Sequence, residues 1–520
     1  MKHRYPSSSA SQQPAPTAQL NDIGFIGAGV MGQNLIMNLV DNGYTVTAFD
    51  LDQSKLDTLL LLDQEERGDQ PPRISRCSSY TELLASIRSP HLIILSVPAG
   101  SAVDDVCHKL IDAGIAADDI LVDTGNSLWT DTIEREKTYE GKLIFFGTAV
   151  SGGEVGARFG PSLMPSGDPY AWTRIKPIWE AIAAKVESST GKPISRSKPG
   201  ETINIGEACT TYIGPSGSGH YVKMVHNGIE YADMQLLCEA YQVLRFGLDY
   251  SCEEISSLFS QWNQGPLASY LLEVSAEVLK TQDPISHQPL VDVILDQAGQ
   301  KGTGLWTSVS SLELGCPAPT IAEAVFARAM STKKLERLRA SDALSGPTNI
   351  PALDTEASFL ESLHDALLCA KTVAYAQGFD LMRQQARQQN WNLDFAAIAK
   401  IWRGGCIIRA ALLRSISAAF QRDPDLENLC LDVNIAESLS QQQQSWREAV
   451  ARITLMGIPT PALSSALSYY DSYRSQLLPA NLLQAQRDYF GAHSFERVDS
   501  PRGKKFHFLW GSPSATIVEQ

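Results

Sequence analysis

The chain has 520 residues, 43% of them apolar, and its 58 acidic and 43 basic side chains give a formal net charge of −15. This length allows several domains with large buried cores. The acidic balance argues against nucleic acid and against an anionic membrane surface as partners, so an anionic ligand would need a local basic cluster. We find no stretch near the roughly 20 apolar residues of a membrane span, and no apolar signal core at the N-terminus.

The nine cysteines show no CxxC pair and no Cys/His spacing suited to zinc. We therefore predict reduced thiols, no metal site and a reducing, cytoplasmic location. Residues 1–21 are rich in Ser, Pro, Gln and Ala, and we interpret them as a disordered N-terminal extension. An organellar presequence is the alternative, because this segment contains Lys2, His3 and Arg4 but no acid.

From residue 22 short apolar runs alternate with segments of helical length. The runs are DIGFIGAG (22–29), YTVTAF (44–49), HLIILSV (91–97), DILVDTG (119–125) and KLIFFGTAV (142–150). Such runs are typical of a parallel sheet covered on both faces. We predict a doubly wound α/β domain over residues 22–214.

Beyond this region the apolar runs disappear and helical periodicity with Ala, Leu and Gln takes over, as in ESLHDALLCAKTVAYAQGF (361–379). This pattern predicts a large all-helical domain over residues 215–495. Residues 496–520 are expected to form an irregular C-terminal tail, and the aromatic residues in FHFLW (506–510) suggest that it docks on another surface.

The first apolar run ends in a glycine turn, GFIGAGVMGQNL, with Gly27, Gly29 and Gly32 in GxGxxG spacing. In a Rossmann-type domain these glycines permit a tight turn, admit a pyrophosphate and pack the helix on the strand. The next run ends at Asp50, where an acid would bind the adenosine ribose of a dinucleotide. A loop or capping carboxylate is the alternative reading of Asp50.

Residues 220–234, HYVKMVHNGIEYADM, predict a helix with two different faces. Lys223, His226, Asn227, Glu230 and Tyr231 share one stripe. The opposite face is apolar and comprises Val222, Val225, Ile229, Ala232 and Leu236. An amphipathic surface helix is the simpler alternative. The chemical variety of the stripe instead favours a ligand-binding face, in which a partly buried Lys223 near the helix start has a lowered pKa and acts as a base.

At this point the sequence resembles the 6-phosphogluconate dehydrogenases of the pentose phosphate pathway, from about residue 22 to about residue 511. The matching blocks are GVMGQNL (29–35), GNS (125–127), VSGGEVGARFGPSLMP (150–165), GHYVKMVHNGIEYADMQLLCEAY (219–241), QAGQKGTG (297–304), EAVFAR (323–328), IWRGGCIIR (401–409) and LPANLLQAQRDYFGAH (478–493). The resemblance implies a homodimer with a coenzyme domain, a helical domain and a tail that reaches the partner subunit.

The resemblance also implies the reaction. Lys223 would take the proton of the substrate's 3-hydroxyl while hydride leaves C3, and the resulting β-keto acid would lose CO2. Protonated Lys223 would stabilise the enolate. Glu230 would then protonate C1 of the enediol to give ribulose 5-phosphate.

The remaining site residues follow from the same resemblance. The carboxylate and hydroxyl end of the substrate would contact Asn126, Ser151, Gly152, Gly153, His226 and Asn227. The phosphate would contact Tyr231, Lys301, Thr303 and Arg328, with Arg487 and His493 from the neighbouring subunit. The NAD or NADP cofactor would contact Gly27, Ala28, Gly29, Val30, Met31, Gly32, Asp50, Leu51, Asp52, Val97, Pro98, Ala99 and Asn126. Taken singly, each substrate residue could instead be an ordinary turn, loop, cap or surface charge.

The chain departs from the family pattern in its coenzyme half. Asp50 and Leu51 replace the Asn-Arg pair of NADP-using members, which predicts a preference for NAD because an arginine would bind the 2'-phosphate. Pro98 replaces a lysine, and Thr124 and Ser166 replace glycines. Two other functions stay open at this stage: a catalytically impaired paralogue that acts as a binding protein, and a β-hydroxyacid dehydrogenase for a related phosphorylated sugar acid.

Overall fold

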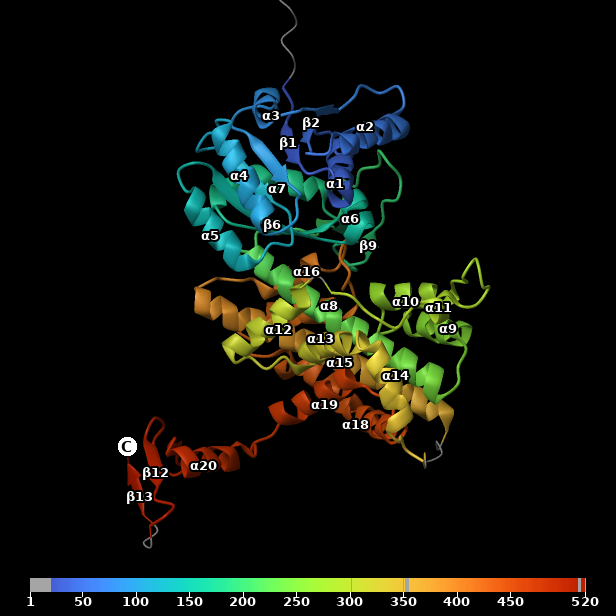
Figure 1. The fold of residues 1–520 in the computed structure, drawn as a ribbon, viewed down its shortest axis with the longest axis vertical. Helices are drawn as coiled ribbons and strands as arrows, with labels where there is room; N and C mark the ends of the chain where they lie inside the picture. The colour runs from blue at the N-terminus through green and yellow to red at the C-terminus, as the bar shows by residue number, and fades with distance from the viewer. Residues whose placement is uncertain (1–19, 301, 349, 351–354, 513–515, 520) are drawn as a thin grey trace, which may run out of the picture. The chain divides into compact units, whose positions relative to one another are not determined.

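The computed structural model describes residues 20–300, 302–348, 350, 355–512 and 516–519 (Figure 1). Most of the predicted N-terminal extension lies outside these residues. Asn21, its last residue, belongs to the folded domain, since it bridges to Ile87 and its side chain donates to the Thr47 hydroxyl over 2.8 Å. No helix among the described residues has both the length and the apolar character that a membrane crossing requires.

A seven-stranded sheet forms the N-terminal half, in the order β3-β2-β1-β4-β5-β6-β7. All neighbouring strands are parallel except β6 and β7, which are antiparallel. The strands are β1 (Ile23–Ile26), β2 (Val46–Phe49), β3 (Ile74–Arg76), β4 (Leu92–Leu95), β5 (Ile120–Asp123), β6 (Ile144–Ser151) and β7 (Ser162–Ser166). The predicted doubly wound α/β domain is confirmed, and the five apolar runs form β1, β2, β4, β5 and β6. The short edge strand β3 and the antiparallel β7 were not predicted, because neither has an apolar run.

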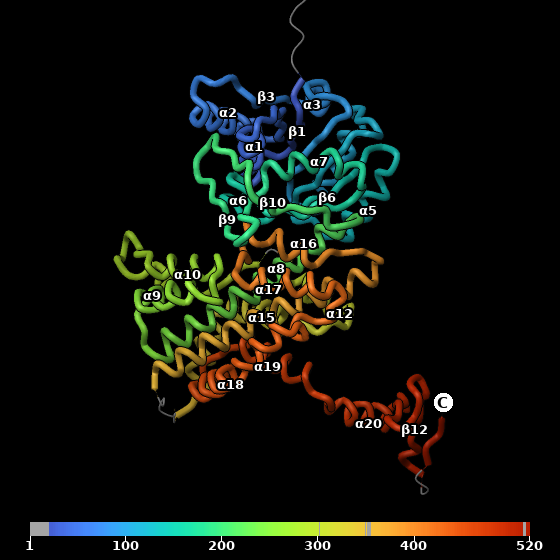
Figure 2. The backbone as a smooth tube through the Cα atoms, turned by 180° about the vertical axis from the view of Figure 1, so that it is seen from behind, coloured from blue at the N-terminus to red at the C-terminus, as the bar shows by residue number. Residues whose placement is uncertain are grey.

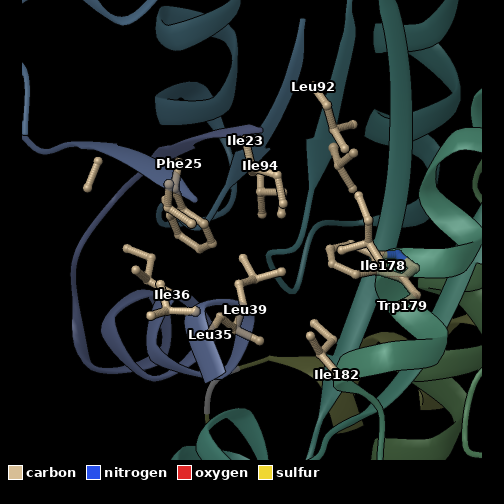
Figure 3. Packing of buried hydrophobic residues seen from close by; sticks show 14 of the residues in the cluster. Ile23, Phe25, Leu35, Ile36, Leu39, Leu92, Ile94, Ile178, Trp179 and Ile182 are labelled. Atoms are coloured by element: carbon tan, nitrogen blue, oxygen red, sulfur yellow. The ribbon is translucent and has the colours of Figure 1, made fainter. Parts of the chain in front are cut away.

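Helices cover both faces of this sheet, as the predicted apolar runs require. Along β4, Leu92 and Ile94 point into one core while Ile93 and Leu95 point into the other. The first core packs against α1 (Val30–Asp41), α2 (Gln53–Arg67), α6 (Gly153–Phe159) and α7 (Pro169–Ile182), as Figure 3 shows in part. The second packs against α3 (Tyr80–Ser86), α4 (Ser101–Asp112) and α5 (Trp129–Tyr139).

A small second sheet follows and leads into the helical half (Figure 2). This antiparallel sheet consists of β8 (Lys185–Val186), β9 (Pro193–Ile194) and β10 (Glu207–Ala208). The helices after it are α8 (Ser218–Gln242), the π-helix η1 (Val243–Gly247), α9 (Cys252–Trp262), α10 (Tyr270–Lys280), α11 (Leu290–Val293), α12 (Thr303–Leu314), α13 (Pro319–Ser331), α14 (Lys334–Ala343), α15 (Glu356–Gln389), α16 (Phe395–Ile401), α17 (Leu412–Arg422), the short 3-10 turn η2 (Leu429–Leu431), α18 (Val433–Leu455) and α19 (Pro461–Tyr473).

Helix α8 connects the two halves. It packs on β6 and β7 of the sheet and on α12, α13 and the long helix α15. The coenzyme and helical parts lie within one compact unit that ends at Leu463, and the division between them at residues 214 and 215 stays a prediction. The second unit comprises Ser464–Gln520, which includes the predicted tail.

The C-terminal unit is more regular than the predicted tail. It contains α20 (Ala480–Gly491) and a three-stranded antiparallel sheet of β11 (Phe495–Glu496), β12 (Lys505–Phe508) and β13 (Ile517–Glu519). The fully buried carboxylate of Asp488 on α20 joins these elements. It accepts hydrogen bonds from the backbone of Ser494 and Phe508, at 2.9 and 3.0 Å, and from the Trp510 indole at 2.9 Å. A short segment has only a small apolar core, and one buried carboxylate that accepts several hydrogen bonds helps to hold its elements together.

Candidate active site

The glycine turn between β1 and α1 has the shape that a dinucleotide requires. Gly27 has φ +99°, and a Cβ there would overlap the carbonyl of Ser96. A Cβ at Gly32 would overlap the Gly27 carbonyl, so the third glycine lets α1 approach the strand. The space beside Gly29 is empty, with no atom within 4 Å of where its Cβ would lie. Gly29 also begins α1 without a side-chain cap, which leaves the helix N-terminus available to a pyrophosphate. The residues therefore fit a dinucleotide cofactor.

Asp50 supports the glycine turn directly. One of its oxygens accepts the Ala28 N–H over 2.7 Å and the other accepts the Asp52 N–H over 2.9 Å. The Lys55 ammonium lies 3.4 Å from the same carboxylate. These contacts match the alternative reading of Asp50 as a capping carboxylate, and its role toward a ribose stays a prediction. Leu51 beside it is 79% exposed.

The other predicted cofactor residues lie at the same edge of the sheet. Val97, Pro98 and Ala99 follow β4, and Asn126 follows β5. Because carboxyl ends of parallel strands meet at one edge, these loops lie beside the glycine turn. Asn126 and Ala99 are exposed, and so is Val30 at the start of α1.

Helix α8 is buried on both of its faces. The apolar positions Val222, Val225 and Ile229 are fully buried, as predicted. Of the polar stripe, His226 is fully buried and Lys223 is 7% exposed. The alternative of an amphipathic surface helix is therefore wrong, because a solvated stripe would be open to water.

The amine of Lys223 lies within a cluster of polar groups. It donates to the Asn227 side-chain oxygen over 2.6 Å and to the Ser151 hydroxyl over 3.1 Å. It also lies 3.3 Å from Nδ1 of His226. Ser151 is the last residue of β6, so the amine sits where the helix crosses the carboxyl edge of the sheet. His226 contacts the same serine through Nε2 at 3.4 Å.

Burial shifts the basic and acidic groups of this cluster in opposite directions. Loss of water lowers the pKa of Lys223, although Glu230 and Cys406 oppose the shift. Loss of water raises the pKa of Glu230, and Asp233 adds to this while Lys223 and Arg328 oppose it. The pKa of His226 falls well below its usual value through burial and the nearby Lys223, so its imidazole is neutral near pH 7. A base whose pKa is lowered thus lies two helical turns from an acid whose pKa is raised.

The SGG loop borders the cluster. Gly152 has φ +123°, and a Cβ there would lie 2.5 Å from the carbonyl oxygen of Gly405. That same oxygen accepts the Ser162 N–H over 2.8 Å. The loop after β6 is therefore held between the sheet and the segment after α16, and only glycine fits at position 152.

The structure brings together some of the residues that were predicted to bind the substrate's phosphate. The Arg328 guanidinium stacks on the Tyr231 ring at 3.5 Å from its centre and donates to the Gly299 carbonyl over 3.2 Å. Thr303 is the first residue of α12, and Gly304 beside it leaves room for the Tyr231 ring. Lys301 lies outside the described residues. Arg487 and His493 belong to the C-terminal unit, where both side chains are exposed.

Comparison with known protein families assigns both halves of the chain. The NAD binding domain of 6-phosphogluconate dehydrogenase matches residues 22–191, and the 6-phosphogluconate dehydrogenase C-terminal domain matches residues 219–510. The chain belongs to the 6-phosphogluconate dehydrogenase family.

Relatives of known function match nearly the whole chain. The chain is 46% identical over 503 residues to 6-phosphogluconate dehydrogenase, decarboxylating, of Cunninghamella elegans, covering 96% of this chain and 99% of the relative. It is 46% identical to the NADP(+)-dependent enzyme of Bacillus subtilis, covering 94% and 98%. Among solved structures, the Plasmodium falciparum 6-phosphogluconate dehydrogenase has a TM-score of 0.86 at 38% identity and covers 94% of this chain and 100% of that one.

Two departures from the family pattern occupy structural positions. Thr124 is buried and its hydroxyl donates to the Leu95 carbonyl over 2.8 Å, which ties the end of β5 to β4. Ser166 ends β7, fully buried against α8 at Gly219. Neither change reaches the Lys223 cluster.

One residue that positions a loop of the site, His220, was not predicted from the sequence. His220 on α8 is nearly fully buried, and its ring contacts the Thr132 hydroxyl at 2.8 Å and the Gly125 carbonyl at 3.1 Å. Since a carbonyl only accepts, Nε2 carries the proton, and burial lowers the pKa of this histidine. His220 thereby fixes the backbone beside Asn126. Its only signal in the sequence was its place in the α8 block.

Proposed function

We propose that this chain catalyses the oxidative decarboxylation of 6-phospho-D-gluconate to ribulose 5-phosphate and CO2, with reduction of a nicotinamide cofactor. The observation that carries the proposal is the pair on α8: Lys223 with a pKa lowered by burial, and Glu230 with a pKa raised by burial, beside Ser151 at the carboxyl edge of the sheet. An ordinary structural pair would favour both charged forms rather than both neutral forms.

Lys223 acts first, as the base. Its unprotonated amine takes the proton of the substrate's 3-hydroxyl, which its lowered pKa makes possible near neutral pH. The bound nicotinamide supplies the acceptor for the hydride that leaves C3. Ser151 and Asn227 hold the amine in place through the contacts at 3.1 and 2.6 Å. The glycine turn and the loops after β4 and β5 hold the cofactor.

The 3-keto acid then loses CO2, because its carbonyl accepts the electron pair of the breaking C1–C2 bond. Lys223 is now protonated and stabilises the enolate oxygen. Glu230, whose raised pKa favours its protonated form, then delivers a proton to C1 of the enediol. The neutral His226 adds no second positive charge that would disfavour protonated Lys223.

Binding of the two ends of the substrate follows the charge pattern. Asn126, Ser151 and the SGG loop hold the carboxylate and hydroxyl end. Arg328 and Thr303, with Lys301, hold the phosphate. The protein has a net charge of −15, so the phosphate needs this local cluster of donors.

Replacing either member of the pair tests the reaction. We expect Lys223→Met and Glu230→Gln each to lower kcat for NAD(P)H formation from 6-phosphogluconate by about 10²- to 10⁴-fold, the usual contribution of a general acid or base. Release of CO2 should fall in parallel. The exposed residues of α10 provide matched controls, Lys280→Met and Glu277→Gln, which should leave kcat unchanged. Full activity in Lys223→Met would refute the assignment, and equal turnover of gluconate would point to another sugar acid.

We further propose a preference for NAD over NADP. Two carboxylates, Asp50 and Asp52, flank Leu51 and disfavour the 2'-phosphate of NADP, while Leu51 offers it no donor. Lys55 is the nearby cation, but it is directed at Asp50. The preference would set this chain apart from its NADP(+)-dependent relative in Bacillus subtilis.

Substituting Leu51 tests this preference. A guanidinium at this exposed position can pair with a 2'-phosphate, so Leu51→Arg should raise the ratio of kcat/KM for NADP to that for NAD by about tenfold or more. Leu61→Arg, an exposed position on α2, is the matched control and should leave the ratio unchanged. A strong NADP preference in the unmodified protein would refute the proposal.

We also propose a homodimer in which Arg487 and His493 complete the phosphate site of the neighbouring subunit. Two features support it. Both side chains are exposed, and they belong to a C-terminal unit whose elements are joined by hydrogen bonds to the buried Asp488 carboxylate. The same unit exposes large apolar residues, among them Leu482, Tyr489 and Phe490, which indicates a protein contact surface.

Subunit mixing tests the exchange. Lys223→Met and Arg487→Gln chains are each expected to be nearly inactive alone. In a mixed dimer, one site would combine an intact Lys223 with an intact Arg487 from the other chain, so co-expression should restore about half of the wild-type activity per mixed dimer. If Arg487 served its own subunit, every site in the mixture would carry one defect and no activity would return.

A further inference from the structure

A second basic cavity lies outside the site described above. It has a volume of about 540 Å³ and opens where the small β8–β10 sheet meets α16 and α17. Figure 2 shows β9 and β10 at the end of the coenzyme half, next to α16. None of the residues that line the cavity belongs to the predicted substrate or cofactor set.

Positive charge dominates the lining. Four basic side chains, Lys400, Arg403, Arg414 and Arg422, face one carboxylate, Glu207. Arg403 pairs with that carboxylate at 2.6 Å, and Arg422 pairs with Asp432 at 2.6 Å. Within the described part of the chain, Lys400 and Arg414 have no ion-pair partner. In a protein of net charge −15, a cluster with two unpaired basic side chains indicates a binding site for an anion.

The backbone is shaped to bring the arginines together. Gly191, in the turn between β8 and β9, has φ +68°. A Cβ at this glycine would lie 3.2 Å from Nη1 of Arg403 and 3.6 Å from Cδ of Arg414. A side chain there would crowd Arg403 and touch Arg414 at ordinary contact distance, and the positive φ favours glycine, which lets the turn close over both arginines.

Arg403 is the most buried of the four and is fixed in place. Its side chain is 10% exposed, its Nε donates to the Lys400 carbonyl over 3.0 Å and its Nη2 pairs with Glu207. Nη1, on the Gly191 side, has no hydrogen-bond partner among the described residues. A pre-positioned guanidinium with a free donor is suited to an anion, because binding then costs little side-chain entropy.

Neutral donors complete the lining. The hydroxyls of Ser188, Ser189 and Ser415 and the amide of Asn434 reach the same cavity from three different segments. Hydroxyl, amide and guanidinium groups together are the donors that phosphate groups take in proteins. The volume falls in the range of about 300–1,000 Å³ typical of small-molecule sites.

We propose that this cavity binds a small phosphorylated anion at a site separate from the active centre. The net charge of −15 over the whole chain disfavours a nucleic acid, which would need an extended basic face. The ligand bridges the last hairpin of the coenzyme half and α16–α17 of the helical half. Lys400 and Arg414 supply its main charge pairing, and Arg403 supplies a directed hydrogen bond.

Calorimetric titration with inorganic pyrophosphate tests the site. The protein is saturated with 6-phosphogluconate and NADH, so that the substrate site and the glycine turn are both occupied, and ionic strength is held constant with sodium chloride. We expect binding to the wild type, and affinity at least tenfold weaker in Lys400→Gln/Arg414→Gln. Lys400→Gln alone should show an intermediate loss, and thermal melting establishes that each variant is folded. Exposed basic residues outside the cavity provide the control Lys142→Gln/Arg339→Gln, which removes the same charge and should bind like the wild type.

Three outcomes would overturn the proposal: no binding to the wild type, equal affinity in the cavity variant, or an equal loss in the control. The first two would remove the site, and the third would reduce it to a general charge effect. Because every comparison is between variants that keep Lys223 and Glu230, the result does not depend on the proposed reaction.

Discussion

The chemistry of the site depends on one constraint, the burial of the Lys223 amine. A lysine removed from water pays a desolvation cost that lowers its pKa, and this protein offsets the cost with polar neighbours instead of a close carboxylate partner. Asn227 and Ser151 accept hydrogen bonds from the amine. Glu230 lies about one helical turn beyond Asn227 on α8. The arrangement lowers the pKa of the amine, whereas a tight ion pair with a carboxylate would raise it.

The fold makes this burial possible by running one helix across two layers. Helix α8 packs on β6 and β7 at one end and on α12, α13 and α15 along its length. The same contact places Lys223 next to the last residue of β6, and it places His220 against the loop after β5. Because the loops after β1, β4, β5 and β6 share one edge of the sheet, the helix lies beside the loops that we propose bind substrate and cofactor. Glycines at positions 152 and 405 then let the SGG loop and the segment after α16 touch through their backbones.

Much of this was predictable from local patterns. The alternation of apolar runs and helices gave the doubly wound sheet, and the spacing of five unlike polar residues on one helix face located the cluster. Strands β3 and β7 were not predicted, because their sequences, ISR and SLMPS, carry no apolar run. Their pairing depends on neighbours distant in the chain. A capping role was one of the two readings of Asp50, but its partner, the Ala28 N–H, is a tertiary contact that no spacing encodes. The same holds for the contact of His220 with Gly125. The grouping of Ser464–Gln520 into a separate C-terminal unit is not visible in the sequence, because helical periodicity continues across Ser464.

The most direct measurement of the central claim is the pH dependence of kcat/KM in the wild type and in Glu230→Gln. Turnover needs Lys223 unprotonated and Glu230 protonated, so wild-type activity should fall at low pH as the amine gains its proton and at high pH as the acid loses its own. Glutamine cannot ionise, and the residual activity of Glu230→Gln should therefore rise with pH and keep its plateau, without the alkaline decline. An unchanged bell-shaped profile in this variant would contradict the account.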